Sequence, residues 1–171
     1  RGARRTRRDV TLGVTGDGVV ESGRALRRPL LTAWYFLTRC AHASDVAGRW
    51  RTDSPLMIDR YVLAKLHDGV NDVTARMNRY DIAVACAVVR GFCDVLTNWY
   101  VRRSRDRFWA GEQDAIDTLH TVLEVTCRLA APLLPLITEA IWRGLPAARS
   151  VHLTGWPDPA SLPQDRALVA S

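Results

Sequence analysis

Long hydrophobic runs are missing from this sequence. No unbroken stretch of about 18 apolar residues occurs, so no membrane-spanning helix is predicted. The basic N-terminal residues 1–9 also lack the apolar centre of a secretory signal peptide. With 47% hydrophobic and 25% charged residues, the 171-residue chain has the composition of one globular domain. We therefore expect a cytoplasmic domain with its own hydrophobic core.

Closely spaced cysteines are missing as well. Cys40, Cys86, Cys93 and Cys127 lie far apart, and no pair has CxxC spacing. Each lies in an apolar, helix-like pattern, which argues against a zinc site or a disulfide framework. We predict four buried free thiols and no bound metal.

Lysine is almost absent, and acidic residues are outnumbered. Lys65 is the single lysine among 24 basic residues, which face 18 acidic ones and give a formal net charge of +6. A positive balance of this kind favours a polyanionic partner over an acidic protein surface.

Apolar residues recur at intervals of three and four along most of the chain, as in helices that bury one face. The pattern predicts an all-α fold, an antiparallel bundle of four main helices plus a short fifth, with an extended C-terminal strap. The predicted helices are 19–42, 55–80, 82–110, 112–130 and 136–145.

Several residues predict where these helices begin and end. Ser54 and Pro55 suit an N-cap and a first helical position, and Asp81 suits the N-cap of the third helix. Gly111 suits the third helix's end. Pro29 lies inside the first helix, where we expect either a kink or the true start of the helix.

The chain divides into three parts on this pattern. Residues 1–17 form a basic flexible arm or a fragment boundary, 18–146 form the helical domain, and 147–171 form the strap and tail. The last residues, 158–171, are expected to be frayed. Asp59 is assigned to the polar, solvent-facing side of the second helix.

One segment of the third helix is rich in both arginine and aromatic residues. It is 98–109, NWYVRRSRDRFW. Arginine makes forked contacts to phosphate, and both residue types stack on bases, so the segment suits nucleic acid. The alternative is a bundle helix with core aromatics and solvated arginines. A helical projection puts Arg103 and Arg107 on one side, and the acidic Asp94 and Asp106 do not balance four arginines.

The order of residues in three segments carries a resemblance. Segment 98–109 resembles a signature of isoleucyl-tRNA synthetases, in the helical anticodon-binding domain. Segment 129–142, LAAPLLPLITEAIW, is similar to a pattern shared by the class I synthetases for isoleucine, valine, leucine and methionine. Segment 150–157, SVHLTGWP, looks like the extended strap that follows this bundle.

The resemblance implies a domain that binds the anticodon arm of tRNA and positions it for isoleucylation by a catalytic domain outside this chain. The alternative function is a free-standing helical module, derived from the same domain, that docks on a protein partner. Two to four of the motif residues are expected to touch RNA, and the remainder to be structural. The residues carried over from the motif are Trp99, Tyr100, Arg102, Arg103, Arg105, Arg107 and Trp109.

The two ATP-handling motifs of class I synthetases, HIGH and KMSKS, are absent from the chain. Lys65 lies in a helical pattern, and the four histidines, His42, His67, His120 and His152, begin no such motif. We therefore expect no catalytic residue, no activity from this chain alone, and use of ATP and Mg only through the missing catalytic domain. The expected partners are that domain and a tRNA, with isoleucine specificity, and neither DNA nor a membrane.

The remaining polar and aromatic candidates suggest structural roles. Asp114 and Asp117 lie in the first turns of a helix, where acids are favoured by the helix dipole. His120 is expected at the core boundary, and Ser104 has no neighbouring base that would make it a nucleophile. Trp34, Trp50, Trp142 and Trp156 are expected to anchor the core or the strap.

Overall fold

The computed structural model describes the backbone of residues 16–145 and 149–169, and the side chains from residue 27 onward. The predicted arm, 1–17, lies almost entirely outside the described residues. Helices account for nearly all regular structure, and no β-strand occurs in the described part of the chain. The elements are α1 (Gly16–Ser44), α2 (Met57–Met77), α3 (Ile82–Asp94), η1 (Val95–Val101), α4 (Arg105–Trp109), α5 (Gln113–Ala130), α6 (Pro135–Arg143), η2 (Val151–Leu153), η3 (Pro159–Ser161) and α7 (Arg166–Val169).

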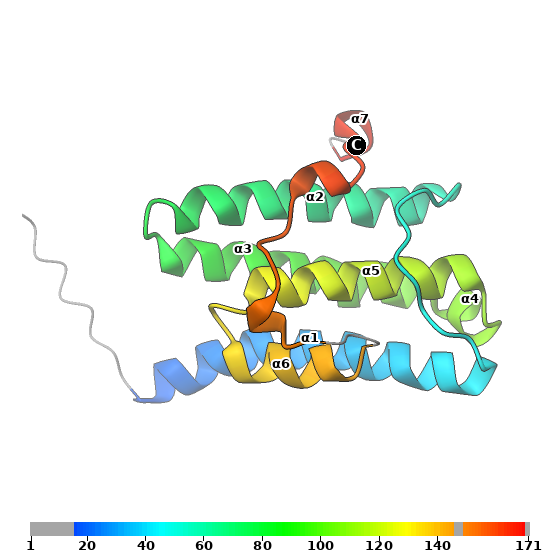
Figure 1. Ribbon diagram of the computed structural model, residues 1–171, viewed down its shortest axis with the longest axis horizontal. Coiled ribbons are helices and arrows are strands. Elements are labelled where there is room, and N and C mark those ends of the chain that lie inside the picture. The colour runs from blue at the N-terminus through cyan, green and yellow to red at the C-terminus, as the bar shows by residue number, and fades with distance from the viewer. Residues whose placement is uncertain (1–15, 146–148, 170–171) are drawn as a thin grey trace, which may run out of the picture.

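The long helices run up and down beside one another, which confirms the predicted all-α bundle (Figure 1). α2 packs against α3 and α5, and α1 packs against the same two helices. α6 lies on α5 next to α1, and η1 continues α3 behind α5 in this view (Figure 1). The bundle prediction succeeds because a one-sided apolar stripe on each helix leaves few other ways to remove that surface from water.

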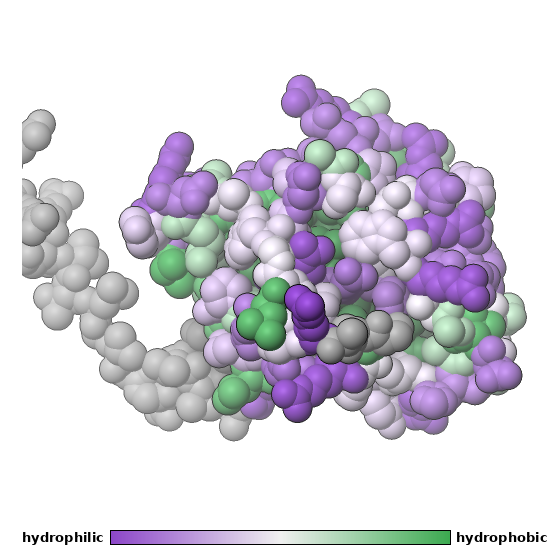
Figure 2. All heavy atoms as spheres, in the orientation of Figure 1, coloured by the Kyte–Doolittle hydropathy of each residue, from purple (hydrophilic) through white to green (hydrophobic). Residues whose placement is uncertain are grey.

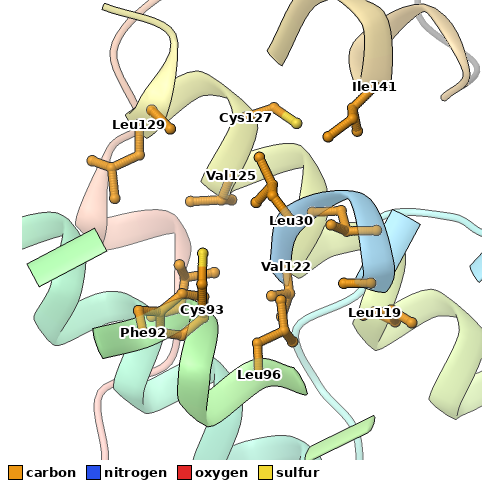
Figure 3. Close-up of a cluster of buried hydrophobic side chains, with 14 of the residues drawn as sticks. Leu30, Phe92, Cys93, Leu96, Leu119, Val122, Val125, Cys127, Leu129 and Ile141 are labelled. Atoms are coloured by element: carbon orange, nitrogen blue, oxygen red, sulfur yellow. The ribbon is translucent and has the colours of Figure 1, made fainter. Parts of the chain in front are cut away.

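The core is built by side chains from α1, α2, α3, η1, α5 and α6, and Figure 3 shows the part where α1, α3, η1, α5 and α6 meet. α5 is the central helix, because residues 115–123 are all buried. This burial on every side requires cover from α1, α2, α6 and the loop before α2. Labelled members of the core include Leu30, Phe92, Cys93, Leu96, Leu119, Val122, Val125, Cys127, Leu129 and Ile141.

The helix ends match the predicted signals at two of three places. The Asp81 side chain accepts a hydrogen bond from the Val84 N–H, so Asp81 is the cap of α3. Gly111 has a φ of +68°, and a Cβ there would lie 2.7 Å from the Cβ of Ser44. Only glycine suits this left-handed and crowded position.

The prediction for Ser54 is wrong. α2 begins at Met57, and the residue before it makes no side-chain cap. The Ser54 hydroxyl instead donates to Asp59 at 2.7 Å, because Asp59 is buried and needs donors. α1 starts at Gly16 and continues through Pro29, so Pro29 is not the start of that helix.

Residues 158–169 are packed and not frayed, contrary to the expectation for that part of 158–171, and residues 170–171 lie outside the described residues. The described part, up to residue 169, lies along α2 (Figure 1). Leu162 is buried, and Arg60 of α2 forms a 2.7 Å ion pair with Asp165. The strap before it is held by Trp156, whose indole N–H donates to the Thr74 hydroxyl at 2.8 Å. The C-terminal segment therefore packs on the polar side of α2. The polar composition of that side does not indicate that it is covered.

The face shown in Figure 2 is largely hydrophilic, with hydrophobic residues in small separate groups. Such scattered groups are ordinary for a soluble surface. One segment, Ile82–Val101, is long and apolar enough to span a membrane by length and composition alone, with a mean hydropathy of 1.4. Arg90 and Asp94 interrupt its apolar run. In this fold the segment supplies Val89, Phe92 and Leu96 to the bundle core.

Candidate nucleic-acid interface

A buried carboxylate lies beneath the arginine-rich segment. Asp59, on the first turn of α2, has no exposed surface. Its oxygens accept hydrogen bonds from the Tyr100 hydroxyl at 2.8 Å, from Ser54, and from two nitrogens of Arg107 at 2.8 and 2.9 Å. Each carboxylate oxygen thus has donors, which is what a buried charge requires.

Arg107 joins this carboxylate to a second one. Its guanidinium also donates to both oxygens of Glu112, at 2.8 and 2.9 Å. Hydrogen bonding to Asp59 raises the pKa of Arg107, so this side chain stays charged at any ordinary pH. Burial raises the pKa of Tyr100 well above its usual value, and the neighbouring charge of Asp59 adds to that rise. The four side chains therefore tie together α2, η1, α4 and the residue before α5.

The helix changes its geometry where it reaches this network. Residues Val95–Val101 form a π-helical turn, and the chain leaves helical geometry at Ser104 before α4 starts. A π-turn closes i→i+5 hydrogen bonds and so alters the direction in which later side chains point. Tyr100 and Phe108 both end in the core, with their rings 6.1 Å apart.

The seven predicted residues separate into three environments. Arg102, Arg103, Arg105 and Trp109 are exposed, with Trp109 at 54%. Trp99 is half-buried, because its ring lies 4.6 Å from that of Tyr61 and the Arg103 guanidinium lies 5.6 Å from its centroid.

Tyr100 and Arg107 are held inside by Asp59. The projection that puts Arg103 and Arg107 on one side does not describe their environments, because Arg103 is exposed and the Arg107 side chain keeps only 19% of its surface. An ideal projection fails here because the chain leaves helical geometry at Ser104, between the two arginines.

The exposed arginines have no acidic partner. Within the described residues, Arg102, Arg103 and Arg105 form no ion pair, and neither do Asp94 and Asp106. We name Arg102, Arg103, Arg105 and Trp109 the arginine ridge. Three guanidiniums that form no ion pair, against the single exposed carboxylate of Asp106 in the same segment, leave a net positive charge that attracts anions.

Asp59 is the important residue that the sequence pattern misplaces. The pattern predicts that it lies on the polar side of its helix, yet it is fully buried. Its partners Tyr100 and Arg107 follow it by 41 and 48 residues, so no local pattern contains the network. Only Glu112 is near Arg107 in the sequence. It follows Arg107 by five residues, a spacing that permits an ion pair between the two and so indicates part of the network.

The other candidates hold loops. Asp117 accepts hydrogen bonds from the Arg49 N–H at 2.8 Å and from Gln113, and Asp114 pairs with Arg51. Both carboxylates therefore fix the segment before α2, a structural role that the expected interaction with the helix dipole does not include.

His120 is buried beneath Gly48 as expected, and its ring nitrogens have no partner in the described structure. Burial lowers the pKa of His120, against the opposing charge of Asp117.

The tryptophans and cysteines follow most expectations. Trp142 is buried and donates to the Arg149 carbonyl at 2.7 Å, while Trp156 anchors the strap. Trp34 is half-buried, but Trp50 is 42% exposed and anchors neither core nor strap. All four cysteines are free thiols, buried at Cys40, Cys93 and Cys127 and half-buried at Cys86.

Comparison with known proteins agrees with the resemblance. The family model described as "Anticodon-binding domain of tRNA ligase" matches residues 59–170. The isoleucine--tRNA ligases of Nocardia farcinica and Mycobacterium tuberculosis are each 56% identical over 158 residues, and that of Tropheryma whipplei is 43% identical over 163 residues. These alignments cover 92%, 92% and 93% of this chain but 15% of each relative.

The chain therefore spans about 15% of the length of the curated relatives it matches. The alternative of a protein-docking module finds no support among these matches. The similarity to the isoleucine branch, first suggested by segment 98–109, is confirmed at 43–56% identity. Since the family model covers well over half of its residues, the chain belongs to the family of anticodon-binding domains of tRNA ligases.

Proposed function

We propose that this chain binds the anticodon arm of tRNA as a domain of an isoleucine--tRNA ligase. It positions the tRNA for isoleucylation by a catalytic domain of the same enzyme, in the cytoplasm. The observation that carries the proposal is the arginine ridge, three exposed guanidiniums with no acidic partner in the described structure.

The ridge has the chemistry of a phosphate-binding surface. Arginine presents a planar fork of donors that matches phosphate oxygens. Each neutralised phosphate releases a counterion, so affinity rises as salt falls. Trp109, exposed next to these arginines, offers a ring on which an unstacked loop base can lie. Phosphate contacts fix the register of the RNA, and the few base contacts contribute specificity.

The buried network supplies rigidity to that surface. Asp59 is within hydrogen-bonding distance of Tyr100 and Arg107, which lie on either side of the ridge arginines in sequence. A surface held in one conformation loses less entropy when RNA binds. No residue of the chain acts as a catalyst in this proposal, because binding and orientation are its whole task.

Titration of labelled isoleucine tRNA at several salt concentrations tests the proposal. The double variant Arg102→Gln/Arg105→Gln should bind more weakly, with the slope of log affinity against log salt reduced by about two. Arg76→Gln/Arg79→Gln is the matched control, since it removes the same charge from exposed positions around the α2–α3 turn. Equal binding by both double variants would contradict the proposal.

Two competitors sharpen the assignment. A tRNA for another amino acid measures how much isoleucine specificity belongs to this domain. Duplex DNA of matched length should compete poorly, because the proposed surface recognises unstacked loop bases together with phosphates. Competition by DNA as strong as that by tRNA would reduce the function to general polyanion binding.

A further inference from the structure

An aromatic and an arginine form a second exposed pair on α1. Tyr35 is 58% exposed, and the guanidinium carbon of Arg39 lies 5.6 Å from the centre of its ring. Arg39 is exposed and forms no ion pair within the described residues. The two side chains are four residues apart, so they lie over one another on a single face of the helix.

This pair is continuous with the arginine ridge. α1 contacts both η1 and α4. Phe36, next to Tyr35 in α1, has its ring 5.1 Å from that of Phe108 and 6.4 Å from that of Trp109, which belongs to the ridge. The positive charges of Arg39 and Arg105 both act on Cys40, where they oppose the rise in the pKa of its thiol caused by burial. Arg39 of α1 and Arg105 of α4 are therefore both near enough to Cys40 for their charges to act on it.

We infer that the RNA-binding face extends onto α1, where Arg39 binds a backbone phosphate and Tyr35 stacks on one unpaired base. This inference rests on the proposed function and adds two residues that no part of the 98–109 motif contains. An exposed ring flanked by a guanidinium is the combination that proteins use for single-stranded segments of RNA. Tyrosine and arginine are also enriched in protein interfaces, so RNA is favoured here because Phe36, next to Tyr35, contacts Trp109 of the arginine ridge.

The experiment uses two RNAs with the same stem. One is the anticodon stem-loop of isoleucine tRNA, and the other is that stem closed as a blunt duplex without unpaired bases. The chain is tested as wild type and as Tyr35→Ala, Tyr35→Phe and Arg39→Gln. Arg79→Gln is the control, an exposed arginine in the α2–α3 turn. Circular dichroism checks that each variant is folded, as expected for exposed positions.

Tyr35→Ala should weaken binding of the stem-loop by about 5- to 150-fold and leave the duplex unchanged, since stacking needs an unpaired base. Tyr35→Phe should retain stem-loop binding because the ring remains. Arg39→Gln should weaken both RNAs and reduce the salt slope by about one.

Wild-type-like binding by both Tyr35→Ala and Arg39→Gln would overturn the inference. An equal loss on stem-loop and duplex for Tyr35→Ala would overturn the stacking contact. The Arg102→Gln/Arg105→Gln variant separates these results from failure of the proposed function. If it still weakens binding while the α1 variants do not, the ridge binds RNA and only the extension is wrong. If the wild-type chain binds neither RNA, the proposed function fails as well.

Discussion

Arg105 and Arg107 are two residues apart in one motif, yet they lie in opposite environments. Arg107 is mostly buried between Asp59 and Glu112, whereas Arg105 is exposed and has no acidic partner in the described structure. The same difference separates Tyr100, which is fully buried, from Trp109, which is 54% exposed. The motif therefore combines a set of residues that fixes the backbone with a set that is displayed on it.

Removal of the buried carboxylate should have the largest effect. Asp59→Ala leaves Arg107 largely buried without its main partner and should destabilise the fold by about 3–5 kcal/mol. Urea denaturation followed by circular dichroism measures this change. The comparison predicts no such loss for Arg102→Gln/Arg105→Gln, which should stay within about 0.5 kcal/mol of the wild type. Equal stability of Asp59→Ala and the wild type would remove the distinction between the two sets.

A smaller effect is expected when Tyr100, another member of the buried network around Asp59, is changed. Tyr100→Phe keeps the ring in the core but removes the 2.8 Å hydrogen bond to Asp59. The loss should be about 1–3 kcal/mol, because one donor to a buried carboxylate is removed. For a domain of this size each kcal/mol shifts the melting temperature by about 2–4 °C. A wild-type melting temperature would mean that Asp59 is satisfied by Arg107 and Ser54 alone.

The smallest expected effect is a pH dependence of stability that comes from His120, a buried side chain without an ion-pair partner in the described structure. Burial lowers the pKa of His120, so the folded protein holds this ring neutral while the unfolded chain protonates it near its usual pKa of 6.5. Its contribution to stability is therefore present above pH 6.5 and is lost as the pH falls toward the lower folded-state pKa. Unfolding free energies measured between pH 5 and 8 should show this decline. His120→Gln should flatten it, and an unchanged slope in that variant would assign the decline to other groups.

The bundle can be predicted from the sequence because periodic apolar stripes, Asp81 and Gly111 are local signals. The burial of Asp59 and the packing of the tail cannot, because their environments depend on distant partners. Asp59 resembles any first-turn acid until Tyr100 and Arg107 approach it. Likewise, Leu162 is one apolar residue in a polar tail, and its burial requires the surface of α2.

The candidate site was predicted in part for the same reason. The segment 98–109 could be recognised from residue order, but the separation of its exposed and buried members depends on a π-turn that propensities do not encode. Tyr35 and Arg39 lie outside the motif on another helix, so only the packing of α1 against α4 brings them beside it.

The π-helical turn at Val95–Val101 has a consequence for insertions and deletions in this region. A π-turn holds one residue more per turn than an α-helix, so loss of one residue from it would restore α-helical geometry and leave the later side chains near their present directions. Loss of one residue from the regular helix α3 has no such compensation and would rotate every later side chain by about 100°. Arg107 would then turn away from Asp59 at the same time as the arginine ridge turned away from its present direction. Loss of a single residue from α3 would thus disable the buried set and the displayed set together, whereas a substitution can affect either one alone. The length of α3 is therefore as constrained as its composition.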